Sequence, residues 1–417
     1  MNNARDLTDD IENQAVLDLA TRYADDHDTG DHHDTGDHRP AVAAEARAAA
    51  LSRHRLAAAN QPVHLSVVWA MYGETGRMAN RREHPHGEDF VRAKVRQLDW
   101  LTAGLDDVTW DIVACDDGCP DRPSSADVMT GIIAEQGYRN VRVIRLADVI
   151  DGTGPSTTHL RTLTSTDQSR KGGSILAGLA AAIDTAVDQP RDTRHVVCYT
   201  DADLSANLAQ LGSLAAPVLD KDATAVLGQR YGMPGAVLVK ADGPVEEPHS
   251  TGDKPDKLII LFRHFVRALL IPDLAHVLDT QAGFKAFDAA ALRPVLPEMT
   301  SFDETFDVEL LIHLAQRYGR AAIAVQPIVF TEDFAATNFP SIDPGARHLA
   351  MVRQVVDLHD RFVAPVAPAT GEAADLLGFL RDLDLNGYVR LIQGLRTLDD
   401  DSLFDRRWPV AELRRLA

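Results

Sequence analysis

The acidic triplet Asp201-Ala202-Asp203 is the first feature of this sequence that could do chemistry. It follows the apolar and β-branched run VVCYT, so two carboxylates come directly after an expected buried strand. Carboxylate oxygens at such a place can bind Mg²⁺ or Mn²⁺ and bridge the metal to a diphosphate. The alternative is a helix N-cap before Leu204-Ser205. The position at a strand end favours the metal site.

A second carboxylate pair, Asp116-Asp117, follows the apolar run WDIVAC and precedes Gly118. One of these carboxylates could hydrogen-bond a base or ribose, as acidic residues often do at the strand ends of nucleotide-binding sheets. The alternative is an ordinary Asp-Gly turn. Cys115 and Cys119 flank the pair, but no second pair of ligands lies at a suitable spacing, so we do not expect a zinc site.

A third candidate is the basic segment Arg170-Lys171-Gly172-Gly173, which precedes the helical sequence SILAGLAAAID. Two cations, two glycines that permit close backbone approach, and a helix N-terminus together suit a phosphate group. A plain basic turn explains the same residues equally well.

The elements that must position these residues alternate between strands and helices. Short apolar runs predict strands, and longer segments rich in helix formers predict helices between them. The expected strands begin with the run VHLSVVWAMYG at Val63 and continue at 110–115, 141–146, 195–200, 223–227 and 322–329, with helices at 90–103, 125–136 and 173–187. This order predicts an α/β fold with a mostly parallel sheet flanked by helices, whose ligands bind at the carboxyl ends of the strands. Those ends carry Glu74, Asp116-Asp117, Asp201-Asp203 and Gly228-Gln229-Arg230.

Composition narrows the class of protein. The chain has 417 residues, of which 45% are hydrophobic and 25% charged, as in ordinary globular proteins. Its formal net charge of -20 argues against a nucleic-acid partner. Three cysteines are too few for a disulfide framework, the first ten residues do not resemble a signal peptide, and no run is apolar enough to span a bilayer. We therefore expect a cytoplasmic protein, with peripheral contact at the inner face of the membrane left open.

The chain divides into three parts on these grounds. Residues 1–61 are expected to form an acidic, partly disordered N-terminal arm with a helix at 41–59. The arm contains the near-repeat HDTGDH, at 27–32 and 33–38, which is either a metal-collecting tract or, as we favour, a solvated low-complexity duplication. Residues 62–362 form the main domain. Residues 363–417 form a Pro/Ala/Gly linker and a helical C-terminal tail, which either caps the body or pairs chains.

Seven motifs in order carry a resemblance to a known family. They are Glu74 after the first strand, CDDGCPD, RKGGSILAGL, TDADLS, LGQR, DTQAGFKAFDAAAL and FDVELLIHLAQRYG. Together they resemble the family 2 glycosyltransferases of the GT-A nucleotide-sugar-binding fold, most closely the dolichyl-phosphate glucose and mannose synthase branch. The resemblance spans 63–333, and its most specific piece is DTQAGFKAF at 279–287.

The resemblance implies roles for individual residues. It implies that Asp117, with Asp116 beside it, binds the uracil or guanine nucleoside, with Lys171 near the nucleotide. Asp201 and Asp203 would hold the divalent metal, and Arg230 would lie near phosphate. Asp279, Gln281 and Lys285 would line the donor and acceptor pocket. Asp307 and Glu309 would belong to the segment that closes the site. Arg170 and Glu74 complete the expected nucleotide-sugar-binding set.

The expected reaction is inverting transfer of a hexose from a UDP- or GDP-linked sugar to a phosphate or hydroxyl acceptor. A hydroxyl acceptor would need a general base, Asp279 or Asp307, and the sequence does not choose between them. The alternatives are a sugar nucleotidyltransferase and a non-catalytic nucleotide-sugar-binding protein. The acceptor is either a small molecule or a polyprenyl phosphate. The segment 258–270 bears on that choice, because its apolar stripe and its three basic residues suit either a membrane interface or, as we favour, a core-facing helix.

Overall fold

The computed structural model describes residues 4–25, 38–154, 160, 162–185, 192–240, 257–332, 344–398 and 406–417. All the residues singled out above at the expected site belong to these ranges. The near-repeat HDTGDH lies outside the described residues except for His38.

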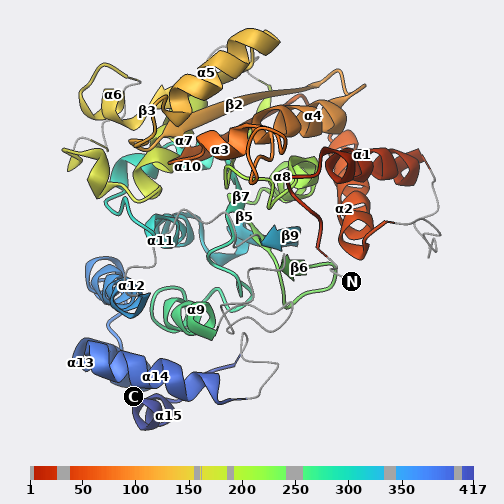
Figure 1. The fold of residues 1–417 in the computed structure, drawn as a ribbon. Coiled ribbons are helices and arrows are strands. Elements are labelled where there is room, and N and C mark those ends of the chain that lie inside the picture. Colours follow the sequence, from red (N-terminus) through yellow and green to blue (C-terminus); the bar gives the residue numbers. More distant parts are fainter. Residues whose placement is uncertain are drawn as a thin grey trace.

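Seven strands form the central sheet (Figure 1): β1 (Val63–Met71), β2 (Val108–Asp116), β3 (Val141–Arg145), β4 (Arg194–Thr200), β5 (Ala225–Gln229), β7 (Phe284–Asp288) and β8 (Ile323–Pro327). Their order is β3-β2-β1-β4-β7-β5-β8, and only β7 runs antiparallel to its neighbours. The central strands are buried on both faces, which is why they read as continuous apolar runs rather than alternating ones. The predicted α/β fold with a mostly parallel sheet is confirmed.

A second, smaller sheet pairs β6 (Val237–Lys240) with β9 (Val329–Glu332) in parallel. The sequence predicted one strand over 322–329, and the structure divides this segment at Ile328 between two sheets. The backbone N–H of Ile328 donates to the Gln229 carbonyl, and the N–H of Val237 donates to the Ile328 carbonyl. The chain therefore crosses from the large sheet to the small one at this residue.

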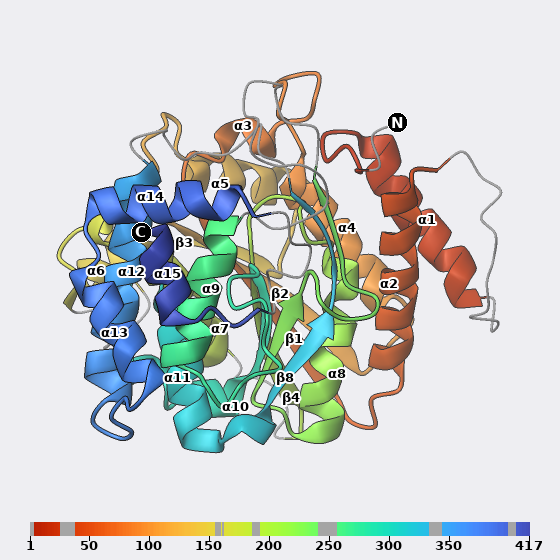
Figure 2. The same cartoon turned by 90° about the horizontal axis from the view of Figure 1, so that it is seen from below.

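Helices cover both faces of the large sheet (Figure 2). On one face α7 (Gly172–Thr185) packs on β1, β2 and β4, together with α11 (Phe306–Tyr318) and, farther out, α9 (Lys257–Leu269) and α12 (Pro344–Leu358). On the other face lie α4 (Phe90–Thr102), α5 (Ser125–Gln136) and α8 (Leu211–Lys221). Helix α7 approaches β1 closely because Gly178 has no side chain, and a Cβ there would collide with Val68.

Short helical turns complete the body. They are α3 (Thr75–Met78), α6 (Leu146–Ile150), α10 (Ala289–Leu292), the 3₁₀ turns Thr166–Gln168, Leu208–Gln210, Leu296–Glu298 and Arg320–Ala322, and a π-helical turn at His359–Val363.

The N-terminal part contains α1 (Asp10–Asp25) and α2 (Pro40–Ala57). Helix α2 corresponds to the predicted helix, whereas α1 was not expected. The two helices pack against each other through Val16, Leu19, Ala46 and Ala49. The Ser213 backbone N–H donates to the Ser52 hydroxyl at 3.1 Å, which ties α2 to α8. Residues 4–25 and 38–57 are thus part of the packed structure.

The C-terminal part contains α13 (Glu372–Asp382), α14 (Leu385–Arg396) and α15 (Val410–Leu416). Leu376, Leu380, Leu391 and Leu413 are buried in one apolar cluster with α9 and α12. The tail therefore caps the body, which is one of the two roles that the sequence left open. The divisions of the chain at residues 61 and 363 stay predictions.

Helix α9 faces the interior. Phe262, Arg263, His264 and Phe265 are all buried, and the favoured core-facing interpretation of this segment is confirmed. The helical period put Arg263 and His264 on the side of the helix opposite the apolar stripe. That side is buried too, because Arg263 forms an ion pair with the interior residue Asp279. Among the described residues, no helix combines the length and apolarity that crossing a membrane requires.

A polar network crosses the large sheet near the amino ends of its strands. The Ser66 hydroxyl donates to Asp111 and lies 2.9 Å from His195 Nε2, while Arg142 forms an ion pair with Asp111 at 3.4 Å. Burial, together with the neighbouring His64, lowers the pKa of His195 from 6.5 to about 4. His195 is therefore neutral in the folded protein at neutral pH.

We predict that this residue makes the protein less stable as the solution becomes acidic. The unfolded chain protonates His195 near pH 6.5, whereas the folded chain does so only near pH 4. Lowering the pH from about 7 to about 5 should therefore reduce the free energy of unfolding by about 2 kcal/mol through this group. The measurement is urea unfolding of the wild type and of His195→Gln across this range. Equal pH dependence in both proteins would contradict the assignment.

Candidate active site

The predicted site residues lie together at one edge of the large sheet. Glu74 follows β1, Asp117 follows β2, Asp201 follows β4 and Arg230 follows β5. These four strands are parallel, so their carboxyl ends meet at the same edge. Lys171 reaches this edge from the turn before α7, with a left-handed backbone at φ 77°. The tertiary structure thus gathers side chains that are far apart in the sequence.

The two carboxylates of the Asp116-Asp117 pair have different partners. Asp116 accepts the backbone N–H groups of Gly118, Cys119 and Ala126 at 2.9–3.1 Å, so it holds the turn and the start of α5. Asp117 accepts the Lys171 N–H at 2.8 Å and the Ser174 hydroxyl at 2.6 Å. Burial raises the pKa of Asp117 to about 6, against the effect of these donors. Asp117 therefore joins the end of β2 to the start of α7.

Asp201 lies between a lysine and a glycine. The Lys171 ammonium forms a hydrogen-bonded ion pair with the Asp201 carboxylate. The Asp201 N–H donates to the Gly283 carbonyl at 3.1 Å, and a Cβ at Gly283 would collide with the Asp201 carboxylate. Burial alone would raise the pKa of Asp201, but Lys171 and Arg230 hold it below its usual value. Position 283 in DTQAGFKAF must therefore be glycine, because any side chain there would overlap the Asp201 carboxylate.

Asp203 belongs to an acidic cluster around Arg77. The Arg77 guanidinium lies 3.6 Å from Asp203, 3.3 Å from Glu74 and 3.5 Å from Glu88. Burial raises the pKa of Glu74 to about 7 and that of Glu88 to about 8, and the nearby Asp203 contributes in both cases. Three carboxyl groups share one guanidinium here, so a further cation at this corner of the site would favour their charged forms.

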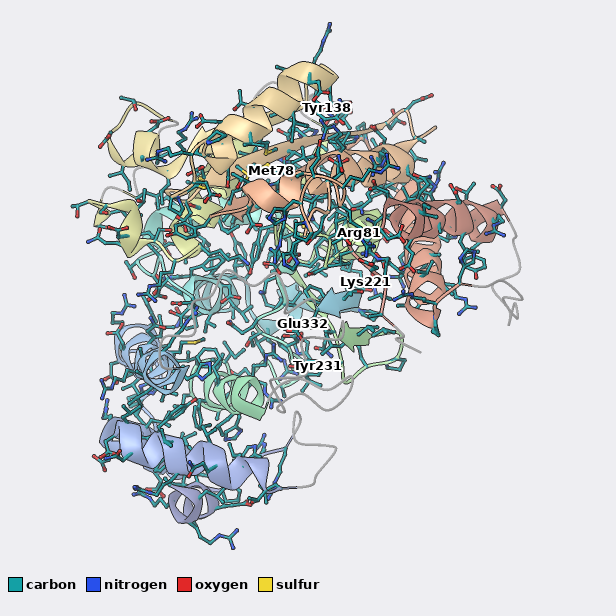
Figure 3. The ribbon with its side chains drawn as sticks, viewed as in Figure 1. Met78, Arg81, Tyr138, Lys221, Tyr231 and Glu332 are labelled. Atoms are coloured by element: carbon teal, nitrogen blue, oxygen red, sulfur yellow. The ribbon has the colours of Figure 1, made fainter. Side chains whose placement is uncertain are left out.

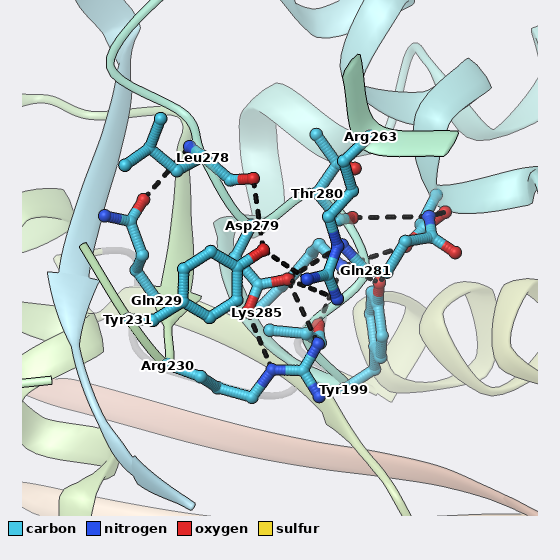
Figure 4. Close-up of polar contacts among 12 residues, drawn as sticks. Tyr199, Gln229, Arg230, Tyr231, Arg263, Leu278, Asp279, Thr280, Gln281 and Lys285 are labelled. Atoms are coloured by element: carbon cyan, nitrogen blue, oxygen red, sulfur yellow. Dashed lines mark hydrogen bonds and ion pairs between the residues drawn. The ribbon is translucent and has the colours of Figure 1, made fainter. Parts of the chain in front are cut away.

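A buried cationic cluster lies on the other side of the site (Figure 4). Arg230 binds both oxygens of Asp279 at 2.7 and 3.1 Å, and Arg263 approaches the same carboxylate at 3.0 Å. Arg263 also donates to the Tyr231 hydroxyl. Asp279 is 1% exposed, and although burial would raise its pKa, the two arginines hold it far below the usual range. Two guanidinium groups on one carboxylate leave a net positive charge.

Lys285 and Asp307 form a second ion pair next to this cluster. Lys285 Nζ lies 2.9 Å from Asp307, 2.8 Å from the Tyr199 hydroxyl and 2.7 Å from the Ala282 carbonyl. The Gln281 side-chain amide donates to the other Asp307 oxygen at 2.9 Å. Burial lowers the pKa of Lys285, an effect that Asp307 opposes. The fold therefore brings Asp307, Gln281 and Lys285 together.

Two predicted site residues face other partners. Glu309, fully buried, accepts the backbone N–H groups of Thr300 and Ser301 at 2.7 Å each. It fixes the loop before α11. Arg170 has an exposed side chain whose guanidinium lies 3.8 Å from Glu304, while its backbone N–H donates to the Phe302 carbonyl.

Several residues of this edge were not predicted from the sequence. Arg77, Glu88 and Tyr199 were not identified, and Arg263 was assigned to the basic side of a helix. Lys94 on α4 was also missed: burial lowers its pKa to about 8, although Asp203 and Asp201 oppose the shift, and its ammonium lies 5.6 Å from the centre of the Trp69 ring. Lys94 interrupts the apolar pattern of a helix that starts with Phe90-Val91. This interruption is the feature of the sequence that could have identified Lys94.

The acidic triplet has the donor chemistry that a divalent metal needs. Asp201 and Asp203 supply hard carboxylate oxygens two residues apart, with side chains 27% and 17% exposed, and Mg²⁺ and Mn²⁺ prefer such ligands. In the described part of the chain no group of three or more His, Cys, Asp and Glu residues is arranged around a common metal position. The remaining ligands would have to come from a bound diphosphate and water, and Lys171 would have to yield one Asp201 oxygen.

No family model matches the chain, and no curated protein matches it. Among solved structures it is similar to glucosyl-3-phosphoglycerate synthase from Mycobacterium tuberculosis in complex with Mn²⁺, UDP-glucose and phosphoglyceric acid, at 17% identity and a TM-score of 0.44, covering 74% of this chain and 83% of that one. It is also similar to a mannosyltransferase from Pyrobaculum calidifontis in complex with GDP-mannose and Mn²⁺, at 12% identity and a TM-score of 0.37, covering 92% and 83%.

We predict that Asp279→Asn destabilises the protein strongly. The change leaves two buried guanidinium groups facing a neutral amide, which should lower the free energy of unfolding by about 3–5 kcal/mol. The matched control is Asp184→Asn, which removes one partner of the exposed pair between Asp184 and Arg293 and should cost less than about 1 kcal/mol. Chemical unfolding of both variants measures the difference. If both variants lost a similar amount of unfolding free energy, the charges of the Asp279 cluster would not be what stabilises it.

Proposed function

We propose that this protein is a metal-dependent glycosyltransferase that moves a hexose from a UDP- or GDP-linked sugar to an acceptor. The observation that carries the proposal is the pairing of opposite charges across one site: the carboxylates of Asp201 and Asp203 stand at the strand ends, and the cations of Lys171, Arg230 and Lys285 stand beside them. A sugar diphosphate donor needs both, a metal for its phosphates and fixed cations for its developing charge. The seven-motif resemblance to family 2 glycosyltransferases supports the same assignment.

The donor nucleoside is assigned to Asp117. Its carboxylate lies at the end of β2 beside the Lys171 turn, and the geometry gives Asp116 the separate role of holding the loop. The diphosphate would then extend toward Asp201 and Asp203. When bound there, Mg²⁺ or Mn²⁺ would neutralise the phosphate charge as a Lewis acid. Lys171, which pairs with Asp201 in the unliganded site, would move from that carboxylate to the leaving diphosphate.

The acceptor side is assigned to Gln281, Lys285 and Asp307. Asp279 is a poor general base, because it is 1% exposed and two arginines hold its pKa far below the usual range. Asp307 is better placed to take a proton from a hydroxyl acceptor, since Gln281 and Lys285 orient its carboxylate. A phosphate acceptor needs no base and would use the cation of Lys285. In either case attack on the face opposite the diphosphate inverts the anomeric centre.

A small-molecule acceptor suits the structure better than a polyprenyl phosphate. Arg263 would have been a natural partner for a lipid headgroup on a membrane-facing helix. It is 2% exposed and engaged with Asp279 and Tyr231. We therefore do not assign the chain to the dolichyl-phosphate branch.

The first test is the release of nucleoside diphosphate from a panel of UDP- and GDP-sugars with Mn²⁺. We expect turnover with at least one donor, and calorimetry should show Mn²⁺-dependent binding of the matching nucleoside diphosphate. The double variant Asp201→Asn/Asp203→Asn should raise the Kd at least about tenfold, or about 1.4 kcal/mol, because the metal loses both carboxylates. Asp184→Asn, an exposed substitution of the same type on α7, serves as the control. Equal affinity with and without EDTA in all three proteins would refute the metal assignment.

A second test separates binding from chemistry at Asp307. With a hydroxyl acceptor, Asp307→Asn should lower kcat by about 10²–10⁴-fold while the Kd of the donor stays unchanged, since only the proton acceptor is lost. Steady-state kinetics together with donor calorimetry measure both quantities. An unchanged kcat would remove Asp307 as the base and favour an acceptor that is already anionic.

A further inference from the structure

The backbone around Leu204, directly after Asp203, is tied on both sides. Its N–H donates to the Glu88 carboxylate at 2.8 Å. Its carbonyl accepts from the Arg5 guanidinium, also at 2.8 Å, across 199 positions of sequence. The N–H of Ser205, in the same peptide group as that carbonyl, donates to the Asp203 carboxylate at 3.1 Å. One peptide group therefore connects Arg5 to the carboxylate of Asp203.

Arg5 is held as firmly as the peptide it binds. It is 1% exposed, and its guanidinium pairs with Glu45 of α2 at 2.8 Å and donates to Asn13 of α1. Glu45 is equally buried, at 1% exposed. The three partners come from α1, α2 and the loop after β4, so the guanidinium joins the N-terminal part to the metal-binding segment.

We propose that Arg5 is a positioning residue that orients Asp203 for the divalent metal, so that the N-terminal segment is a structural part of the donor site. This inference rests on the proposed function. Without Arg5, the buried Leu204 carbonyl would lose its donor, and its peptide group would have to turn to find another. Turning that peptide moves the Ser205 N–H away from Asp203, and small misplacements of a ligand are costly in a site that must be preorganised.

A second contact of the same segment supplies a control. Arg81, labelled in Figure 3, pairs with Asp6 at 2.8 Å, where the two side chains are 58% and 31% exposed. This pair also fastens the N-terminal segment to the body but does not touch the loop after β4. Removing it loosens the segment without releasing Leu204.

The test compares Arg5→Met/Glu45→Met with Asp6→Asn. The double variant removes both buried charges together, so neither is left unpaired in the interior. Calorimetry measures the binding of UDP and of GDP, each with Mn²⁺ and with EDTA, in the full-length protein, and thermal unfolding checks that each variant is folded. We expect the double variant to lose at least about tenfold in Mn²⁺-dependent affinity. Affinity in EDTA should change little, and Asp6→Asn should behave as the wild type.

The outcomes separate this inference from the proposed function. If the wild type shows no Mn²⁺-dependent binding of either nucleotide, both ideas are refuted. If the wild type binds with Mn²⁺ and the folded double variant keeps that affinity, only the role of Arg5 is refuted. An equal loss with Mn²⁺ and with EDTA would also refute it, because that pattern indicates a general loss of structure.

Hydrogen exchange of the wild type gives an independent measurement that needs no variant. The amides of Leu204 and Ser205 should be protected before any ligand is added, because Glu88 and Asp203 accept their hydrogen bonds. Rapid exchange that slows only after Mn²⁺ and nucleotide are added would show that the ligand, rather than Arg5, orders the loop.

Discussion

The ion pairs of Asp279 with Arg230 and Arg263 are the interaction on which the acceptor side of the site depends. They join the end of β5, the middle of α9 and the segment before β7. Because Asp279 is almost wholly buried, its carboxylate can stay charged only while it is paired with the two arginines. The pairs thereby fix the start of the DTQAGFKAF segment. Gln281, Gly283 and Lys285 in that segment then meet Asp307 and Asp201 at their observed positions.

The rest of the site also follows the rule that a buried carboxylate needs a cation beside it. The carboxyl groups near the metal segment lie against cations, with Lys171 at Asp201 and Arg77 shared among Glu74, Glu88 and Asp203. In a chain whose net charge is -20, such cations are gathered where phosphate would otherwise be repelled. Ligand binding can then proceed by exchange of partners. A metal would replace Lys171 at the Asp201 carboxylate, and a phosphate of the donor would bind the ammonium of Lys171.

The appendages take part in this arrangement rather than lying outside it. Residues of the N-terminal part reach the loop after β4 through Arg5, and α2 packs on α8. The C-terminal helices cover α9 and α12, and α9 in turn supplies Arg263 to the site (Figure 1). Both ends of the chain thus support a side chain at the carboxyl edge of the sheet.

Local sequence determined the parallel strands of the large sheet, several helices and the strand-end carboxylates, because a buried strand requires an apolar run and a turn after it requires polar residues. It did not predict β6 or β7. It marked Lys171 through the two cations and two glycines before a helix, and Asp307 and Lys285 through the motif resemblance. It could not show that Asp116 and Glu309 would use their oxygens on backbone N–H groups, since those partners depend on loop geometry. It misjudged Arg263, because a helical period does not tell which face meets a buried carboxylate. Only the tertiary structure brought Arg5 to Leu204 and Arg77 to Asp203, since contacts across 199 and 126 positions leave no trace in local pattern.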